Sequence, residues 1–361
     1  MRVPSPLQER HITCLENVRS AMSLSKWLEC PHIRRVSAQV SGLSFRDFKG
    51  AADVAAMTRV SHLSWEADGV EWMTSPEDTL SWLEDKSDHD HATDLLMIEG
   101  DGEVVGYSEL AWDSKDADPK YYGHSVHLLP EWRSRGIMEA VFDSNESRLR
   151  EISSAHPVSG RPYIKLWAFD GPNDWKTKVE SSGYSPIWHL LEMVHKDLGS
   201  VRDAPEPAGL DYGPLCPEEY GAVWALFREC FSTEQWSSPE RWSEKVYEEW
   251  LCSPNFRPDL CRVARAGGEI VGVVENYVNE DECATYGRRV AHSNRVCVRE
   301  DWRRKGITTY LMTCSLKQLR DMGVEEVTLD TEVENKSRAM RVYQAVGFVT
   351  RRTFTFYAKP M

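Results

Sequence analysis

The sequence predicts an α/β (α+β) protein built from two similar domains in tandem. From Leu43 onward, segments with a strand pattern alternate with segments of helical periodicity, which is typical of sheets flanked by helices. The same order of segments then runs a second time, since Trp302 lies 170 residues after Trp132 and Gly347 lies 164 residues after Gly183. A repeat of about 165 residues made twice indicates two domains rather than a solenoid.

Composition places the boundaries of these domains. The first 40 residues lack clear periodicity, and the stretch from Gly199 to Gly209 contains Pro205 and Pro207, as linkers often do. We therefore divide the chain into an N-terminal extension 1–40, a first domain 41–199, a linker 200–209 and a second domain 210–361.

Each domain reads as strands and helices in a similar order. In the first domain we expect strands at 43–46, 94–99, 103–112, 124–128, 163–169 and 188–195, and helices at 53–61, 77–84 and from about 137 to 152. In the second we expect a strand from 210, helices at 218–231 and 240–250, strands at 261–266, 269–278 and 295–298, and a helix from 307 that stops at Gly323. The turn Gly100-Asp101-Gly102 predicts a hairpin.

Charge and cysteine usage narrow the partners. The net charge of -14 in 361 residues argues against nucleic acid or an anionic membrane as a partner, and no apolar run is long enough to span a bilayer. The nine cysteines have no metal-ligand spacing, so we expect reduced thiols, no metal and a cytoplasmic protein. The acidic run 85–94, with His89 and His91, is interpreted as a charged loop rather than a metal site.

A basic, glycine-containing turn joins strand 295–298 to the helix that starts at 307. It reads Arg303-Arg304-Lys305-Gly306. Unpaired backbone N–H groups at a helix N-terminus, the helix dipole and a glycine that permits close approach together predict a site for a phosphate. Neither G-x-x-x-x-G-K-[ST] nor G-x-G-x-x-G is present, which removes two common phosphate-binding motifs. A turn of the same kind precedes the helix of the first domain.

Two motifs in the second domain resemble those of the GNAT superfamily of acyl-CoA-dependent N-acyltransferases. One is [RQ]-x-x-G-x-[GA] between a strand and a helix, with Thr in place of the final Gly or Ala, and the other is N-x7-Y-x3-G-[FY]. The matching residues are Arg303, Gly306, Thr308, Asn335, Tyr343, Gly347 and Phe348. Over about residues 41–361 the chain is similar to tandem bacterial GNAT proteins of the mycothiol synthase kind. The resemblance implies two GNAT domains, each with a mixed, mostly antiparallel twisted sheet flanked by helices.

The resemblance also implies an acetyl-CoA-dependent N-acetyltransferase whose two domains are unequal. Tyr343 stands where GNAT enzymes place the tyrosine thought to protonate the leaving thiolate, a suitable task for a phenol. The first domain has Val179 at this place, so we expect a degenerate first domain and a catalytic second one. The cofactor-binding residues implied in the second domain are Cys297, Val298, Arg303, Arg304, Lys305, Gly306, Ile307, Thr308, Thr309 and Asn335. For the first-domain turn, with Arg133, Arg135, Gly136 and Ile137, coenzyme A binding and a purely structural role both stay open.

The general base is the part of the site that the sequence defines least. Relatives often place Glu on the strand before the turn, where this chain has Asn294, which we assign to acceptor binding because an amide cannot take a proton at neutral pH. The candidate bases are Glu275 and Glu332, each on a strand expected to border the cleft. Transfer through a water chain and deprotonation by bulk solvent are alternatives.

The acceptor is expected to be a primary amine of a small molecule, and the acidic composition favours a cationic one such as an amino sugar or a polyamine. Protein amines remain an alternative, as does a non-catalytic, acyl-CoA-binding regulatory protein in which both sites are vestigial. The protein is expected to be a monomer or a homodimer.

Overall fold

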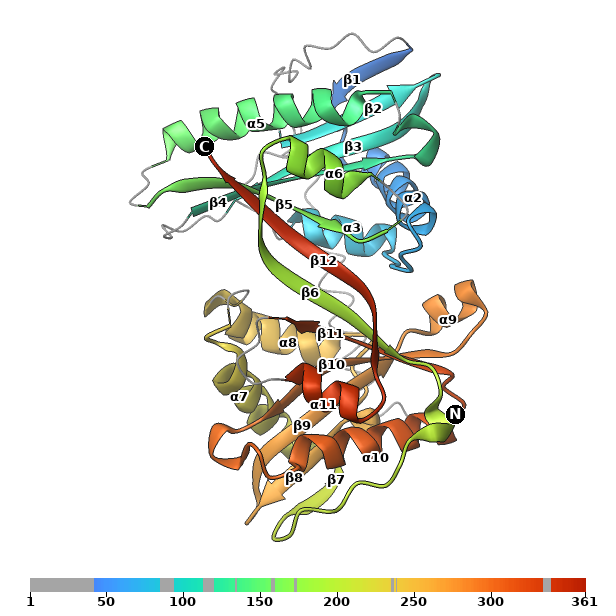
Figure 1. Ribbon diagram of the computed structural model, residues 1–361, viewed down its shortest axis with the longest axis vertical. Helices are drawn as coiled ribbons and strands as arrows, with labels where there is room; N and C mark the ends of the chain where they lie inside the picture. The colour runs from blue at the N-terminus through green and yellow to red at the C-terminus, as the bar shows by residue number, and fades with distance from the viewer. Residues whose placement is uncertain are drawn as a thin grey trace, which may run out of the picture. The chain divides into compact units, whose positions relative to one another are not determined.

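The computed structural model describes most of the chain from Gly42 to the C-terminus (Figure 1). The described residues are 42–84, 94–112, 120–133, 135–156, 160–171, 174–234, 237, 239–333 and 339–361. The expected N-terminal extension, the histidines of the expected charged loop (His89 and His91) and Asn335 lie outside them. None of the helices in the described ranges is long and apolar enough to cross a membrane.

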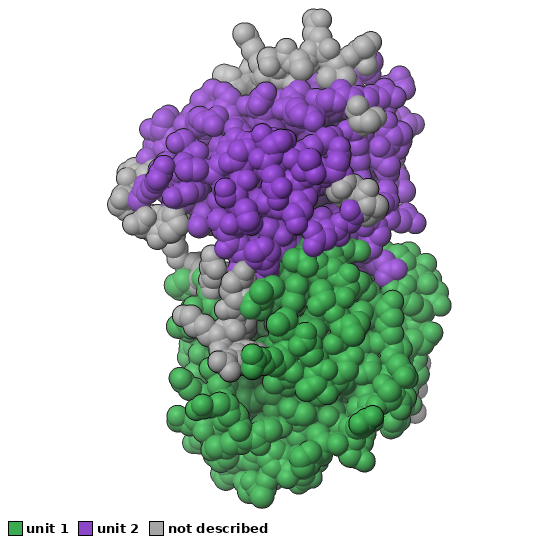
Figure 2. All heavy atoms as spheres, in the orientation of Figure 1, with its two compact units in different colours: residues 1–22, 190–353 green, residues 23–189, 354–361 purple. Residues whose placement is uncertain are grey.

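The chain forms two compact units (Figure 2). The N-terminal unit contains the described residues up to His189 together with Phe354–Met361. The C-terminal unit contains Leu190–Thr353.

The N-terminal unit is a sheet with helices packed on it. Its elements are β1 (Leu43–Asp47), α2 (Ala51–Ala67), α3 (Pro76–Glu84), β2 (Leu95–Gly100), β3 (Glu103–Trp112), β4 (Lys120–Leu128), α5 (Ile137–Ala155), β5 (Pro162–Phe169) and α6 (Trp175–Ser181). The strand order is β1-β2-β3-β4-β5, then the end of β12 (Val349–Pro360). The hairpin predicted at Gly100-Asp101-Gly102 is confirmed, and both Asp101 and Gly102 have positive φ.

The C-terminal unit repeats this plan. Its elements are β6 (Ser185–His195), β7 (Asp211–Pro214), α7 (Tyr220–Phe231), α8 (Glu244–Cys252), β8 (Arg262–Ala266), β9 (Glu269–Val278), α9 (Glu280–Tyr286), β10 (Val290–Val298), α10 (Ile307–Asp321), β11 (Glu326–Glu332) and α11 (Ala339–Ala345). The strand order is β6-β11-β10-β9-β8-β7. The pairs β4–β5 and β10–β11 are parallel and the other pairs within each unit are antiparallel, which confirms the expected mixed, mostly antiparallel sheet.

The last strand of each repeat pairs within the other unit. Residues 190–195 of β6 follow the N-terminal repeat but pair with β11, and residues 354–360 of β12 follow the C-terminal repeat but pair with β5. The expected ranges 41–199 and 210–361 left each final strand with its own repeat, and the structure differs in this respect. The pattern of a segment indicates a strand, whereas its partner depends on contacts far away in sequence.

Helices cover both faces of the C-terminal sheet. Val298 of β10 and Leu329 of β11 pack in one buried cluster with Leu311 of α10 and Tyr343 of α11. Cys297 points to the opposite face, where it packs in a cluster with residues of α7 and α8. Neighbouring residues of β10 therefore face opposite layers, as strand geometry requires. Gly323 has positive φ after α10 and ends that helix as predicted.

Candidate active site

The parallel strands at the centre of the C-terminal unit separate part-way along their length. β10 and β11 pair only as far as His292 and Thr328, although both strands continue. At the same level the register of β10 against β9 shifts between Ser293 and Arg295, and such a bulge bends a strand. The separation leaves a gap that exposes one edge of β10.

The backbone of Val298 is directed into this gap. The N–H of Arg299 donates to the carbonyl of Val271 in β9 at 2.8 Å, and in an antiparallel pair the bonded residues alternate. Cys297 therefore turns its backbone groups toward β9, and Val298 turns its own toward the gap. Arg303 donates from Nε to the Val298 carbonyl at 3.0 Å, so this side chain fastens the turn to the strand. Of the two residues expected to pair with pantetheine, Val298 has the suitable backbone direction.

The turn after β10 presents backbone N–H groups. Arg304 and Gly306 have φ of 63° and 82°, a conformation that glycine adopts without strain. Gly306 is the N-cap of α10 and supplies no side-chain cap, and the first helical hydrogen bond runs from Tyr310 to Gly306 at 3.0 Å. The N–H groups of residues 307–309 thus have no partner within the helix, which is the geometry of an anion site.

Basic side chains border this turn. Arg304 and Lys305 are exposed, and the Lys305 ammonium lies 4.2 Å from the centre of the Trp302 ring. Ile307 is buried and anchors the first turn of α10, while Thr308 and Thr309 are half-buried. The predicted group from residue 303 to residue 309 therefore lies together at the mouth of the gap.

Tyr343 lies on α11 and is buried, with 6% of its surface exposed. Burial, and to a smaller extent the Cys297 thiol, raise the pKa of its phenol, so the hydroxyl is protonated at neutral pH. Among the described residues its hydroxyl has no hydrogen-bond partner. The following turn needs glycine, because Gly347 has φ of 106° and a Cβ there would lie 2.5 Å from Nε2 of His195. Tyr343 can therefore donate a proton to a group bound near Cys297.

The carboxylate of Glu275 is buried and already bonded by three donors. Trp250 Nε1 donates to it at 2.6 Å, Arg295 at 2.9 Å and Asn294 Nδ2 at 3.1 Å. A carboxylate held by a guanidinium and two further donors is a weak proton acceptor. Two residues predicted for the site, Asn294 and Glu275, thus contact each other. Glu332, the other candidate base, is buried at the end of β11, and the structure brings it into no printed contact with them.

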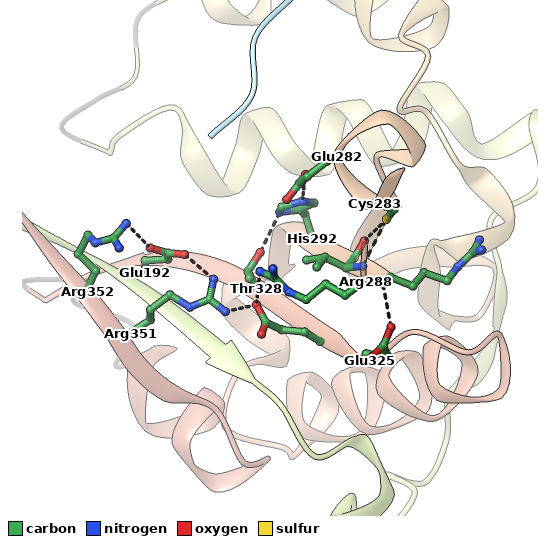
Figure 3. Close-up of polar contacts among 12 residues, drawn as sticks. Glu192, Glu282, Cys283, Arg288, His292, Glu325, Thr328, Arg351 and Arg352 are labelled. Atoms are coloured by element: carbon green, nitrogen blue, oxygen red, sulfur yellow. Dashed lines mark hydrogen bonds and ion pairs between the residues drawn. The ribbon is translucent and has the colours of Figure 1, made fainter. Parts of the chain in front are cut away.

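A polar cluster beside the gap was missed by the sequence analysis (Figure 3). His292 lies between Glu282 of α9 and Thr328 of β11, with contacts of 2.7 and 2.8 Å. The ring of Tyr277 stacks on the ring of His292 at 4.8 Å. His292 stands two residues before Asn294 on the same strand, a position that could have drawn attention to it, whereas its partners come from other elements.

The N-terminal unit contains a matching gap. β4 and β5 pair only as far as Gly123 and Lys165, and the carbonyl of Leu128 accepts from Nε of Arg133 at 3.3 Å. Gly136 has φ of 69° and is the N-cap of α5, again without a side-chain cap. Two features repeat in detail: the separated parallel strands, and an arginine that fastens the turn to the first of them.

The side chains around this second gap differ. The guanidinium of Arg133 bonds Asp68 at 2.6 Å and both oxygen atoms of Ser64 at 2.7 and 2.8 Å. Arg135 lies 4.1 Å from the Trp132 ring, Ile137 is buried, and Val179 is buried in the helix that corresponds to α11. A cleft of about 500 Å³ in this unit is lined by residues of α2, β4, α5, β5 and α6, five of them aromatic: Trp65, Phe142, Trp167, Phe169 and Trp175.

Metal chemistry finds no ligand set here. Within the described ranges, no three His, Cys, Asp or Glu side chains are grouped to hold a metal ion.

Comparison with known sequences identifies related proteins. Residues 57–156 and 221–348 each match the Acetyltransferase (GNAT) family. The chain is 24% identical to the spore coat polysaccharide biosynthesis protein SpsD of Bacillus subtilis over 259 residues, covering 70% of this chain and 82% of that protein. It is 24% identical to a mycothiol acetyltransferase of Sanguibacter keddieii over 325 residues, covering 86% and 94%. N-alpha-acetyltransferase 30 of Xenopus laevis is 34% identical over 101 residues, only 28% of this chain and 36% of that protein.

Solved structures have the same fold. A GCN5-related N-acetyltransferase from Sphaerobacter thermophilus superposes with a TM-score of 0.65 and 21% identity, over 90% of this chain and 97% of that one. A tandem GNAT protein of the clavulanic acid biosynthesis pathway gives a TM-score of 0.57 and 17% identity, over 88% and 98%. The predicted tandem GNAT fold is therefore confirmed.

Proposed function

Because this chain belongs to the Acetyltransferase (GNAT) family and is an N-acetyltransferase, we propose that its C-terminal unit transfers the acetyl group of acetyl-CoA to a primary amine of a small molecule. The observation that carries the choice of unit is Tyr343, a buried and protonated phenol beside the gap, against Val179 at the corresponding place. Valine has no proton to donate. The same contrast argues against a protein in which both sites are vestigial.

In this proposal the cofactor lies in the gap between β10 and β11. The pyrophosphate binds the N–H groups at the start of α10, with Arg304 and Lys305 beside it. The pantetheine arm pairs with the free edge of β10 as an added strand would, and the Val298 N–H polarises the thioester carbonyl. Asn335, expected to bind the same arm, lies outside the described residues.

The reaction proceeds by direct attack. The amine nitrogen forms a bond to the carbonyl carbon, the tetrahedral intermediate collapses, and the carbon–sulfur bond breaks. Tyr343 gives its proton to the departing thiolate of coenzyme A. Glu275 is a poor base for the amine, since its carboxylate is held by Arg295, Trp250 and Asn294.

Two observations bear on the acceptor. The net charge of -14 favours a cationic amine, and the relatives that match most of this chain bear names from small-molecule and polysaccharide chemistry. The local likeness to N-alpha-acetyltransferase 30 favours a second candidate, the α-amine of a protein. A panel of glucosamine, spermidine and a synthetic peptide with a free N-terminus, assayed by release of the coenzyme A thiol, separates the two.

Calorimetric titration of acetyl-CoA into the wild type, Gly306→Glu and Gly136→Glu tests the assignment of the units. A glutamate at Gly306 has a strained φ and brings negative charge to the anion site, so binding at the C-terminal unit is expected to be lost with transfer activity. Gly136→Glu is the matched control and is expected to keep activity. Loss of activity in Gly136→Glu alone would reverse the assignment, and no binding to the wild type would overturn the proposal.

A further inference from the structure

Glu282, His292 and Thr328 form a hydrogen-bonded chain at the vertex of the C-terminal gap. His292 and Thr328 are the last paired residues of β10 and β11, so the chain crosses between the strands where they separate (Figure 3). Glu282 Oε2 lies 2.7 Å from Nε2 of His292, and Thr328 Oγ1 lies 2.8 Å from Nδ1. Glu282 and Thr328 are buried, and 23% of the His292 side chain is exposed.

These contacts define the direction of each hydrogen bond. An ionised carboxylate can only accept, so Nε2 of a neutral His292 carries the proton and donates to Glu282. Nδ1 then has a lone pair and accepts from the Thr328 hydroxyl. The hydroxyl oxygen keeps acceptor capacity for one further N–H donor. This is the arrangement in which a hydroxyl passes a proton to a carboxylate-oriented imidazole.

The groups around the imidazole suit a positive charge. Facing the ring are Glu282 from α9, Tyr277 from β9, and Thr328 and Asp330 from β11. Removal of water by the surrounding chain, followed by the Glu192 carboxylate, raises the pKa of Asp330 to about 6, although its side chain is solvent-accessible. Burial, with Glu282, Asp330 and Glu275, raises the pKa of Tyr277 to about 12. The ring is therefore bordered by one uncharged phenol and by carboxyl groups.

We propose that His292, oriented by Glu282, receives the proton that the acceptor amine loses, and that the Thr328 hydroxyl passes it on. As the nitrogen bonds to the acetyl carbon, its N–H proton moves to Thr328 Oγ1 while the Thr328 proton moves to His292 Nδ1. Thr328 is unchanged, the imidazole becomes an imidazolium paired with Glu282, and its exposed edge returns the proton to solvent. This inference rests on the proposed function of the C-terminal unit.

The chain of residues fits this task better than the carboxylates expected from the sequence. Glu275 is bonded to the guanidinium of Arg295, whereas His292 contacts a carboxylate and a hydroxyl. Asn294 cannot accept a proton at neutral pH. The His292 chain reaches the gap from the α7 and α8 face of the sheet, whereas Tyr343 comes from α11 on the other face. The two proton transfers of the reaction thus have separate groups.

The experiment measures kcat between pH 5.5 and pH 9, with saturating acetyl-CoA and the panel amine that gives the highest turnover. For His292→Gln we expect kcat at pH 7 to fall about 100-fold or more. The wild-type rate declines on the acid side, where a protonated imidazole accepts no proton, and the variant is expected to lack that decline. Any slope from ionisation of the amine itself is common to both proteins.

Further variants separate proton transfer from structure. Thr328→Val is expected to lose activity and Thr328→Ser to restore it, because only the hydroxyl matters. Glu282→Gln is expected to give a smaller loss than His292→Gln. Glu280→Gln is the matched control, since Glu280 is on the same helix but is exposed and pairs with Arg289. Calorimetric affinity for acetyl-CoA is expected to stay unchanged in all four.

Each outcome is decisive. A wild type that acetylates no panel amine overturns the proposed function and this inference with it. An active wild type whose His292→Gln variant keeps its kcat and its acid decline overturns the inference alone. If His292→Gln does not fold, equal activity of Thr328→Val and Thr328→Ser overturns it.

Discussion

The N-terminal and C-terminal units share a backbone device and differ in the side chains placed around it. In both, two parallel strands separate, a glycine N-cap opens the next helix, and an arginine donates to the last carbonyl before the turn. In the C-terminal unit that arginine, Arg303, is exposed. In the N-terminal unit Arg133 also bonds Asp68 and Ser64 of α2. The device is thus retained in one unit as a structural joint.

The comparison teaches that fold and chemistry are encoded by different residues of each repeat. The gap requires only strand pairing that ends early and a glycine where φ is positive, and both units satisfy this. Transfer in addition requires a proton donor, which Tyr343 supplies and Val179 cannot. Three substitutions exploit this difference, and a matched residue of the other unit serves as the control for each.

The largest effect is expected from Tyr343→Phe. Loss of the hydroxyl removes the proton for the thiolate, so kcat should fall by about 100- to 10,000-fold. Affinity for acetyl-CoA in calorimetry should not change, because the ring is kept. The control is Tyr184→Phe in the N-terminal unit, whose hydroxyl donates to Glu146 and is expected to have no effect on kcat. Full activity of Tyr343→Phe would contradict the role of the phenol.

Replacing the two arginines should divide stability from binding. Arg133→Ala leaves the buried Asp68 carboxylate without its cation, and we expect the free energy of unfolding to fall by about 3 kcal/mol. Arg303→Ala removes one hydrogen bond to Val298, at about 1 kcal/mol, and weakens acetyl-CoA binding through the loosened turn. Urea denaturation and calorimetry measure both quantities. Equal losses of stability would mean that the two turns are held in the same way.

Sequence reasoning was successful where the signal is local. The strand, basic turn and helix from Arg295 to Gly323, and the glycine after Tyr343, can be read from spacing because helix termini and turns depend on adjacent residues. The exchange of β6 and β12 could not be predicted, since strand partners lie far apart in sequence. The same holds for Glu282, which reaches His292 from the short and unpredicted helix α9.

The smallest of the three effects concerns the glycine that ends each repeat. Gly347 has φ of 106°, and a Cβ would meet the buried His195 ring at 2.5 Å, whereas Gly183 has φ of 86° and open space around it. Gly347→Ala carries backbone strain plus a collision, about 2 kcal/mol, and Gly183→Ala carries the strain alone, about 1 kcal/mol. Urea denaturation of both variants measures the difference. Because Gly347 follows the helix that holds Tyr343, its alanine variant should also lose turnover, and a Gly183→Ala variant that lost as much would show that the two turns serve the reaction equally.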